Sequence, residues 1–145
     1  MVRLIQHLLP PMQEQGWGRI INISSAAGVN PAPGIGVYST TKAAVLNLTV
    51  TMAQAMDADG VTINAVSPGA ILTPSMVEMA RSQGMGQTLE EVEAATSQMM
   101  NSVPFRRMGR INEVADVVVF LASARASYIH GANIRVDGGY VPTIN

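Results

Sequence analysis

A tyrosine and a lysine four residues apart are the part of this sequence best suited to chemistry. Tyr38 and Lys42 lie at the start of a long stretch with helical apolar spacing, and positions i and i+4 of a helix share one face. A positive charge beside a phenol favours the phenolate, so such a tyrosine can exchange a proton with an alcohol or a carbonyl near neutral pH. Alone, the pair is weak evidence, because such residues often share a solvated helix face.

A serine thirteen residues before Tyr38 adds a third candidate. Ser25 follows residues 19–24, which we predict to be a buried parallel strand because they are rich in isoleucine and apolar on both faces. Ligands bind open parallel sheets beyond the carboxyl ends of the strands. Ser25 is therefore a candidate to hydrogen-bond a substrate oxygen and stabilise charge there. Taken alone, it would be a loop residue that caps a backbone group.

The candidates belong to a set of four motifs, at residues 18–28, 38–44, 64–69 and 131–139. In order and spacing these motifs resemble the short-chain dehydrogenase/reductase family in its compact single-domain form, over the whole chain. The resemblance implies an NAD(P)-dependent oxidoreductase that interconverts an alcohol and a ketone. Its catalytic residues would be Ser25, Tyr38 and Lys42, with Tyr38 as the general acid or base and Lys42 also binding the nicotinamide ribose.

The resemblance also implies a cofactor-binding segment after the second strand. Besides Tyr38 and Lys42, the segment that contains Pro68 and Gly69 would lie against the cofactor. The backbone of Ile71 would then meet the carboxamide, and Thr73 would reach the pyrophosphate. Glycine permits close backbone approach, although Pro-Gly by itself predicts only a turn.

Half of the family's pattern is missing. The family's Gly-rich strand-turn-helix, which receives the pyrophosphate on a helix N-terminus, is not present, and the catalytic Asn would lie just before Met1. We therefore expect an α/β fold that is the C-terminal half of a Rossmann-like doubly wound parallel sheet, with the N-terminal cofactor-binding half absent. Residues 1–145 would form one partial domain with the catalytic and substrate-binding half, inactive when isolated. The ribose-reading residue would lie in the absent half, so NAD and NADP both stay open.

The expected elements alternate between helix and strand, which predicts a parallel α/β sheet. We expect Pro10 and Pro11 to kink the first helix and Asn112 to cap the last. The expected helices cover residues 1–15, 37–57, 74–82, 88–101 and 112–123, and the expected strands cover residues 19–24, 61–66 and 132–136.

The low content of charged residues indicates that part of the protein surface is apolar and buried against another surface. Charged residues make up 13% of the chain, against about 25% in ordinary soluble domains. A partner or the absent half would cover part of this apolar surface, although an ordinary, well-buried α/β domain is also possible. In the family, the helices at 1–15 and 37–57 pair across a twofold axis, which implies a homo-oligomer, either a dimer or a tetramer.

Other classes of protein are disfavoured. The net charge of −1 without a basic block argues against nucleic acid, and the apolar runs are too short to cross a membrane. The start lacks the pattern of a signal peptide, so the expected location is cytoplasmic.

There are no cysteines for disulfides or thiol chemistry. His7 and His130 have no ligands at metal spacing, so no metal site is expected. The expected partner is a small-molecule alcohol or carbonyl substrate.

Two other functions are alternatives to the oxidoreductase. A non-catalytic fragment, or a dimerisation or interaction module derived from such an enzyme, remains the main rival. A sugar-nucleotide epimerase is disfavoured, because those relatives carry a sizeable substrate domain after the Pro-Gly strand.

Six of the ten methionines lie between Met76 and Met108, a region that folds over the substrate in the family. They could form an adaptable apolar lid or simply pack helices.

Overall fold

Three parallel strands form the central sheet of this α/β protein. The computed structural model describes residues 1–56 and 60–143. The strands are β1 (Gly18–Ile23), β2 (Val61–Pro68) and β5 (Asn133–Val136), in the order β1-β2-β5. All three predicted strands are therefore present, with bounds shifted by one or two residues.

The middle strand, β2, is the most deeply buried element. Its residues are all buried up to Ser67, and two of its buried polar side chains, Asn64 and Ser67, form hydrogen bonds, as buried polar groups require. Asn64 Nδ2 donates to the Ile129 carbonyl at 2.8 Å, and Asn64 Oδ1 accepts from the Ala132 N–H at 2.9 Å. Ser67 Oγ donates to Asn133 Oδ1 at 2.7 Å. These bonds fix the register of β5 beside β2.

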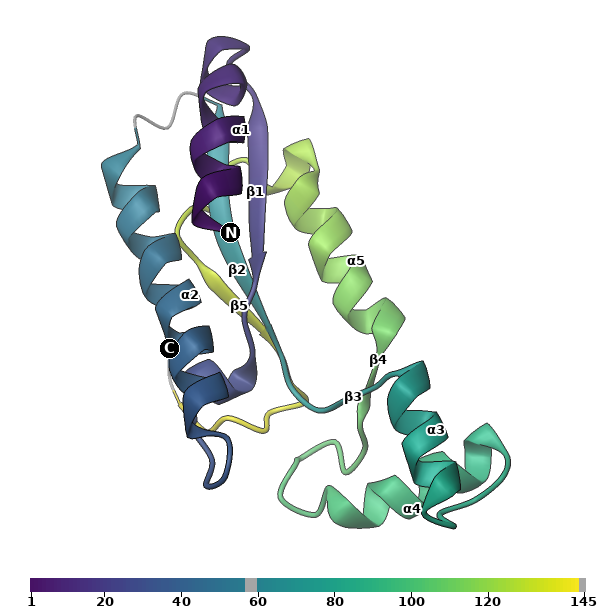
Figure 1. Cartoon of the computed structure of the whole chain (residues 1–145). Helices are drawn as coiled ribbons and strands as arrows, with labels where there is room; N and C mark the ends of the chain where they lie inside the picture. Colours follow the sequence, from purple (N-terminus) through teal and green to yellow (C-terminus); the bar gives the residue numbers. More distant parts are fainter. Residues whose placement is uncertain (57–59, 144–145) are drawn as a thin grey trace.

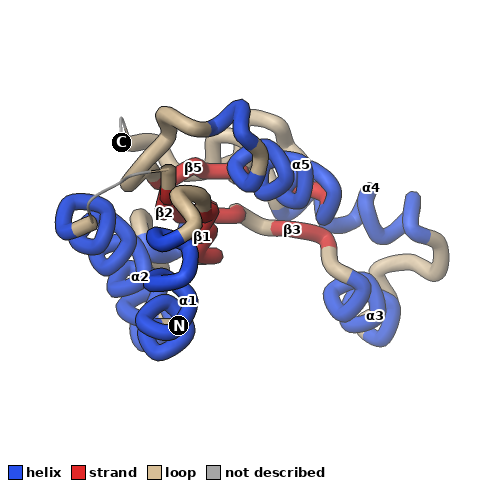
Figure 2. Tube along the Cα trace, turned by 90° about the horizontal axis from the view of Figure 1, so that it is seen from above, coloured by secondary structure: helices blue, strands red, loops and turns tan. Residues whose placement is uncertain are grey.

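Helices cover both faces of the sheet, as a doubly wound fold requires (Figures 1 and 2). Helices α1 (Val2–Glu14) and α2 (Gly36–Ala55) lie on one face, and α5 (Ile111–Ala122) lies on the other. A buried core forms between the sheet and α5 from Val66, Leu121 and Ala126, with Ile21, Val114, Val117, Val118, Ile129, Ile134 and Val136 packed around it. The short helix η2 (Ala124–Ala126) leads from α5 towards β5.

Helix α1 passes through both of its prolines and ends at Glu14. No helix among the described residues has the length and apolarity that a bilayer span needs.

The segment between β2 and α5 extends beyond the carboxyl edge of the sheet (Figure 1). It contains β3 (Ile71–Leu72), α3 (Pro74–Ser82), α4 (Leu89–Met99) and β4 (Gly109–Arg110). β3 and β4 pair in parallel, with Ile71 opposite Gly109. This pair was not predicted from the sequence, because two residues are too few to show a strand periodicity.

The start of α5 corrects one prediction. Arg110 is the N-cap residue and α5 begins at Ile111, so Asn112 lies inside the first turn and does not cap the helix. Glu113 takes that role, because its Oε2 accepts the Arg110 N–H at 2.7 Å. Arg107 holds the same carboxylate with two bonds, of 2.9 and 2.6 Å. This bidentate ion pair positions Glu113 better for capping than a lone amide.

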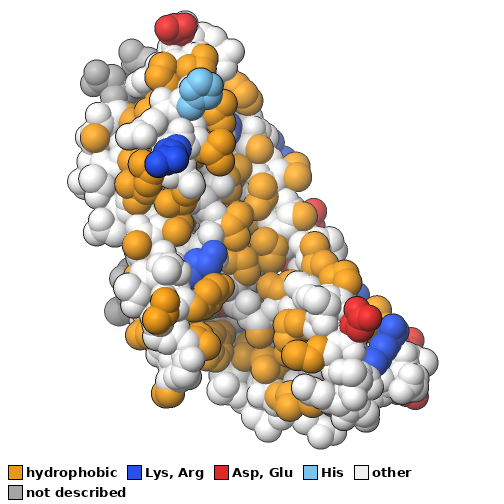
Figure 3. All heavy atoms as spheres, in the orientation of Figure 1, with side chains coloured by type: hydrophobic (Ala, Val, Ile, Leu, Met, Phe, Trp, Pro, Cys, Tyr) orange, Lys and Arg blue, Asp and Glu red, His pale blue; other side chains and the backbone are white. Residues whose placement is uncertain are grey.

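The surface of the molecule is poor in charge. In Figure 3, apolar side chains are spread over the visible face, with only a few charged groups between them. Large exposed apolar side chains occur on α1 and α2, among them Leu4, Leu8, Val37 and Val50.

Candidate active site

Ser25 lies just beyond the carboxyl end of β1, where the strand leads into the short helix η1 (Ala26–Gly28). Its Oγ accepts the Ala27 N–H at 3.2 Å and so caps η1. A hydroxyl that accepts one hydrogen bond still has its own proton to donate. The capping role and a role towards a ligand oxygen are therefore compatible in Ser25.

Tyr38 and Lys42 lie one turn apart near the start of α2. Lys42 Nζ is 5.6 Å from the centroid of the Tyr38 ring, so the four-residue spacing places the ammonium over the ring. Lys42 Nζ also donates to the Ile23 carbonyl, at the end of β1, at 3.1 Å. An ammonium has three donors, so two remain for a ligand. Tyr38 is 47% exposed and thus accessible.

A serine and a glycine hold α2 against the end of β1. Ser24 Oγ donates to the Lys42 carbonyl at 2.8 Å. Gly28 lies so close to α2 that a Cβ built on it would be 2.8 Å from the Lys42 carbonyl carbon and 3.0 Å from the Ala43 nitrogen. Gly28 was not among the predicted site residues; in the sequence it is marked only by its place at the end of the Ser-Ser-Ala-Ala-Gly segment.

The segment after β2 is held by contacts within the protein. A Cβ on Gly69 would lie 2.8 Å from Asp137 Cα, so the close backbone approach at Gly69 is made to Asp137. The Gly69 N–H donates to the Val136 carbonyl at 3.0 Å. Thr73 Oγ1 accepts the Met76 N–H at 3.3 Å and caps α3.

One cavity of about 830 Å³ brings together every predicted site residue: Ser25, Tyr38, Lys42, Pro68, Gly69, Ile71 and Thr73. The apolar wall of this cavity was not predicted; α5 contributes Val114, Ala115, Val118 and Val119 to it. The four-residue spacing of Val114 and Val118 was a usable signal, because such positions share one helix face.

A second cavity, of about 340 Å³, adjoins the first at Ser25, Tyr38, Gly69 and Ala70. Lys42 lines only the larger cavity. The Ser25 and Tyr38 hydroxyl groups thus belong to residues that border two spaces at once. This arrangement suits a reaction between two bound molecules.

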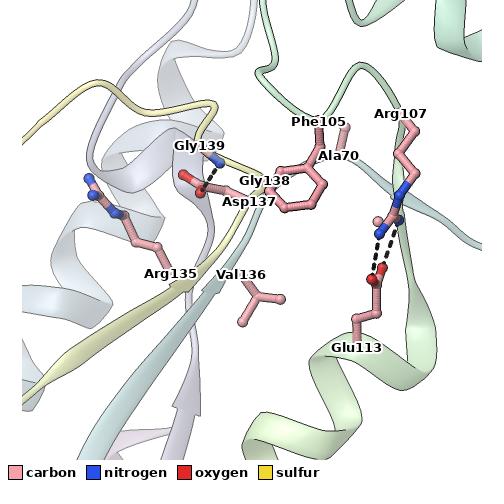
Figure 4. Close-up of a pocket in the computed structure, with 10 residues that line it drawn as sticks. Ala70, Phe105, Arg107, Glu113, Arg135, Val136, Asp137, Gly138 and Gly139 are labelled. Carbon is pink, nitrogen blue, oxygen red and sulfur yellow. Dashed lines mark hydrogen bonds and ion pairs between the residues drawn. The ribbon is translucent and has the colours of Figure 1, made fainter.

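A third cavity, of about 320 Å³, holds none of the predicted site residues and shares only Ala70 with the cavity of about 830 Å³ (Figure 4). Its charged groups are engaged within the protein. Arg107 pairs with Glu113, and Asp137 accepts the N–H groups of Gly139 and Val141 at 3.0 and 3.1 Å. The Arg107 hydrogen bonds, followed by that of the Arg110 N–H, lower the pKa of Glu113 to about 2.

His130, which is half-buried, bonds backbone groups of the protein. His130 Nδ1 accepts the Ile63 N–H at 3.2 Å, and its Nε2 lies 2.9 Å from the Ala53 carbonyl. Within residues 1–56 and 60–143, no three His, Cys, Asp or Glu side chains form a group that could hold a metal ion.

Comparison with known proteins gives consistent matches over almost the whole chain. A family model described as enoyl-(acyl carrier protein) reductase matches residues 1–141. The D-beta-hydroxybutyrate dehydrogenase of Rhizobium meliloti is 33% identical over 136 residues, which are 94% of this chain and 53% of that protein. The 3-oxoacyl-acyl-carrier-protein reductase FabG of Staphylococcus epidermidis is 37% identical over 135 residues, covering 93% of this chain and 50% of that protein.

A solved structure of similar sequence also has the same fold as this chain. The L-sorbose reductase of Gluconobacter frateurii, complexed with NADPH and L-sorbose, superposes with a TM-score of 0.86 and 33% identity. The match covers 99% of this chain and 54% of that one. The chain therefore spans about half the length of the relatives that it matches.

Proposed function

Because this chain belongs to the short-chain dehydrogenase/reductase family, we propose that it forms the catalytic and substrate-binding part of an NAD(P)-dependent oxidoreductase that interconverts an alcohol and a ketone. The observation that carries the proposal is the border between the two cavities. Ser25 and Tyr38 line both, and Lys42 lines only the larger. The larger cavity would hold the nicotinamide end of the cofactor, and the smaller would hold the substrate.

The residues around the larger cavity fit such a cofactor. Lys42 retains two donors for ribose hydroxyl groups after its bond to Ile23. Thr73 caps α3, and a helix N-terminus carries partial positive charge that favours phosphate oxygens. Ile71 lines the same space. When bound, the cofactor supplies the hydride in reduction and accepts it in oxidation.

The proposed chemistry at the protein side is a proton transfer at one oxygen. Tyr38 Oη gives its proton to the carbonyl oxygen in reduction and takes the alcohol proton in oxidation. Ser25 Oγ donates a hydrogen bond to the same oxygen and stabilises the charge that develops there. The Lys42 ammonium, 5.6 Å from the Tyr38 ring centroid, stabilises the negative charge that Tyr38 gains when its proton leaves.

A second candidate function is supported by the exposed apolar side chains of α1 and α2. Leu4, Leu8, Val37 and Val50 are exposed on these two helices. Contiguous exposed apolar surface is typical of protein interfaces. In this alternative, the chain acts only as a pairing module of a homo-oligomer and performs no redox step.

A chimera separates the two functions. The N-terminal half of the Staphylococcus epidermidis relative would be joined ahead of Met1, and NADH and NADPH binding and ketone reduction would be measured beside the 145-residue chain. We expect the chimera to bind one of the two cofactors and to reduce ketones. A folded chimera that binds neither and reduces no ketone, yet forms a stable oligomer, would reject the oxidoreductase and support the pairing module.

A further inference from the structure

The smaller cavity has a lining that constrains what it can bind. Its walls come from η1, the loop before α2, the start of α2, the segments after β2 and β5, and the end of α4. Its polar side chains are all uncharged, including Asn30, Ser102 and Tyr140 in addition to Ser25 and Tyr38. Among the described residues that line it there is no Lys, Arg, His, Asp or Glu.

Lys42, the one cation among the proposed site residues, does not line the smaller cavity. Lys42 lines the larger cavity, and its ammonium is bonded to the Ile23 carbonyl at 3.1 Å. A carboxylate or a sulfonate that enters the smaller cavity would lose hydration without gaining an opposite charge. Such a transfer is costly unless the charge is paired and hydrogen-bonded.

The remaining lining is apolar and partly uncovered. Met99 is 59% exposed and Ile35 is 43% exposed, and both line the cavity together with Met100 and four alanines. A ligand that covers these side chains gains from removing apolar surface from water. The flexible methionines can adjust to the shape of the ligand, and the volume of about 340 Å³ lies near the lower end for small-molecule sites.

From this lining we infer that the substrate is a small, uncharged carbonyl compound with an apolar body, bound between Ile35 and the Met99–Met100 pair. This inference rests on the proposed oxidoreductase function and adds the class of its substrate. Asn30 and Ser102 can bond an uncharged polar group on that body, because neither side chain requires a charged partner. On this inference, the protein does not recognise its substrate through an anionic group such as a carboxylate.

Three ketones of nearly equal shape test the inference. They share an acetophenone core and carry a methyl group, a carboxamide or a carboxylate at the para position: 4-methylacetophenone, 4-acetylbenzamide and 4-acetylbenzoate. Dissociation constants would be measured at pH 7 by ligand-observed NMR, on the 145-residue chain and on the chimera, and turnover would be measured on the chimera. We expect both neutral ketones to bind at least tenfold more tightly than the carboxylate.

A charge-introducing variant provides the matched test. Met99→Lys places a cation on the cavity lining and should reduce the preference for neutral ketones over the carboxylate to threefold or less. Met79→Lys is the control, because Met79 is also exposed but lies on α3, outside the smaller cavity. It should leave the preference unchanged.

The outcomes for function and for substrate class are distinct. Equal or tighter binding of 4-acetylbenzoate by the wild type would overturn the inference, even if the chimera reduces ketones. A preference that Met99→Lys leaves intact would also overturn it, because the charge balance of this cavity would then not set the selectivity. If the neutral ketones bind preferentially but a folded chimera reduces none of them, the oxidoreductase function fails and only the binding preference stands.

Discussion

Tyr38 combines exposure with a neighbouring positive charge, which is the combination that a proton-transferring phenol requires. Tyr38 lines two cavities, and the ammonium of Lys42, which lines only the larger one, lies over the Tyr38 ring. Ser25 borders the same two spaces from η1. At the scale of single residues, the proposed chemistry depends on the phenolic oxygen of Tyr38.

Replacement of Tyr38 by Phe tests that oxygen directly. In the chimera, Tyr38→Phe should lower ketone turnover about 100-fold or more, because general acid catalysis typically contributes about 10²–10⁴-fold. The ring and its contact with Lys42 remain, so the dissociation constant of the cofactor should change less than about threefold. Steady-state kinetics and cofactor titration measure the two effects.

Tyr128→Phe is the matched control, because Tyr128 is fully exposed and lines neither cavity of the site. It should leave turnover unchanged. If Tyr38→Phe also keeps wild-type turnover, Tyr38 is not the acid or base.

At the scale of elements, the contact between η1 and α2 sets the position of Lys42. Gly28 allows the two backbones to approach closely, and the Ser24 hydroxyl bonds the Lys42 carbonyl at the same point. The buried bond from Asn22 Nδ2 to Thr49 Oγ1, at 2.9 Å, ties α2 to β1 again, two turns further along the helix.

A methyl group at Gly28 should push these elements apart. Gly28→Ala should lower the free energy of unfolding by about 1–3 kcal/mol, as overpacking typically does, and should weaken cofactor binding because Lys42 moves. Gly36→Ala is the control, since nothing lies within 4 Å of a Cβ at Gly36. It should leave stability unchanged or raise it by about 0.5–1 kcal/mol. Chemical denaturation of both variants measures the difference, and equal stabilities would contradict the packing role of Gly28.

The cap of α5 predicts a dependence of stability on pH. The hydrogen bonds from Arg107 and from the Arg110 N–H lower the pKa of Glu113 to about 2, from a reference value of 4.5. A carboxylate whose pKa is lower in the folded state stabilises the fold above its unfolded pKa, and this contribution is lost as the pH falls from about 4.5 towards 2. Both partners remain partly exposed, at 41% and 37%, so salt should screen the effect.

Glu113→Gln tests this dependence, because it keeps a capping acceptor and removes the charge. Its melting temperature should lie below that of the wild type at pH 7, and the gap should narrow as the pH falls from 5 to 3. Glu78→Gln serves as the control, since Glu78 is exposed on α3. A gap that stays constant over this range would show that the charge of Glu113 does not stabilise the fold.

At the scale of the whole molecule, one edge of the sheet and one wall of the site are uncovered. Within the described residues, β1 pairs only with β2, so its other edge has backbone donors and acceptors without strand partners. The uncovered wall of the site is the apolar face of α5, which lines the larger cavity. An edge of this kind tends to pair with another chain.

The 145-residue chain should therefore self-associate and bind cofactor far more weakly than the chimera. Calorimetric titration with NADH and NADPH, combined with light scattering, measures both properties. We expect species larger than a monomer and no binding in the micromolar range. A monodisperse monomer that binds either cofactor at micromolar concentration would contradict this prediction and show that the chain is sufficient by itself.

The sequence by itself determined the features that depend on neighbouring residues. The spacing of Tyr38 and Lys42 placed both on one face of α2, because four residues span one helical turn. The apolar runs at residues 19–24 and 61–66 predicted two parallel strands, of which β2 is buried as expected, whereas β1 is mostly only partly buried. The motifs predicted the family and the doubly wound fold, which the comparisons confirm.

Only the tertiary structure decided the features made by residues distant in sequence. The pairing of β3 with β4, the contact between Gly69 and Asp137, and the capping of α5 by a carboxylate that Arg107 holds each depend on how separate segments meet. The same is true of the two cavities that meet at Ser25 and Tyr38. Local patterns report the periodicity of one element, whereas the shape and charge of a cavity depend on which side chains several elements bring to one place.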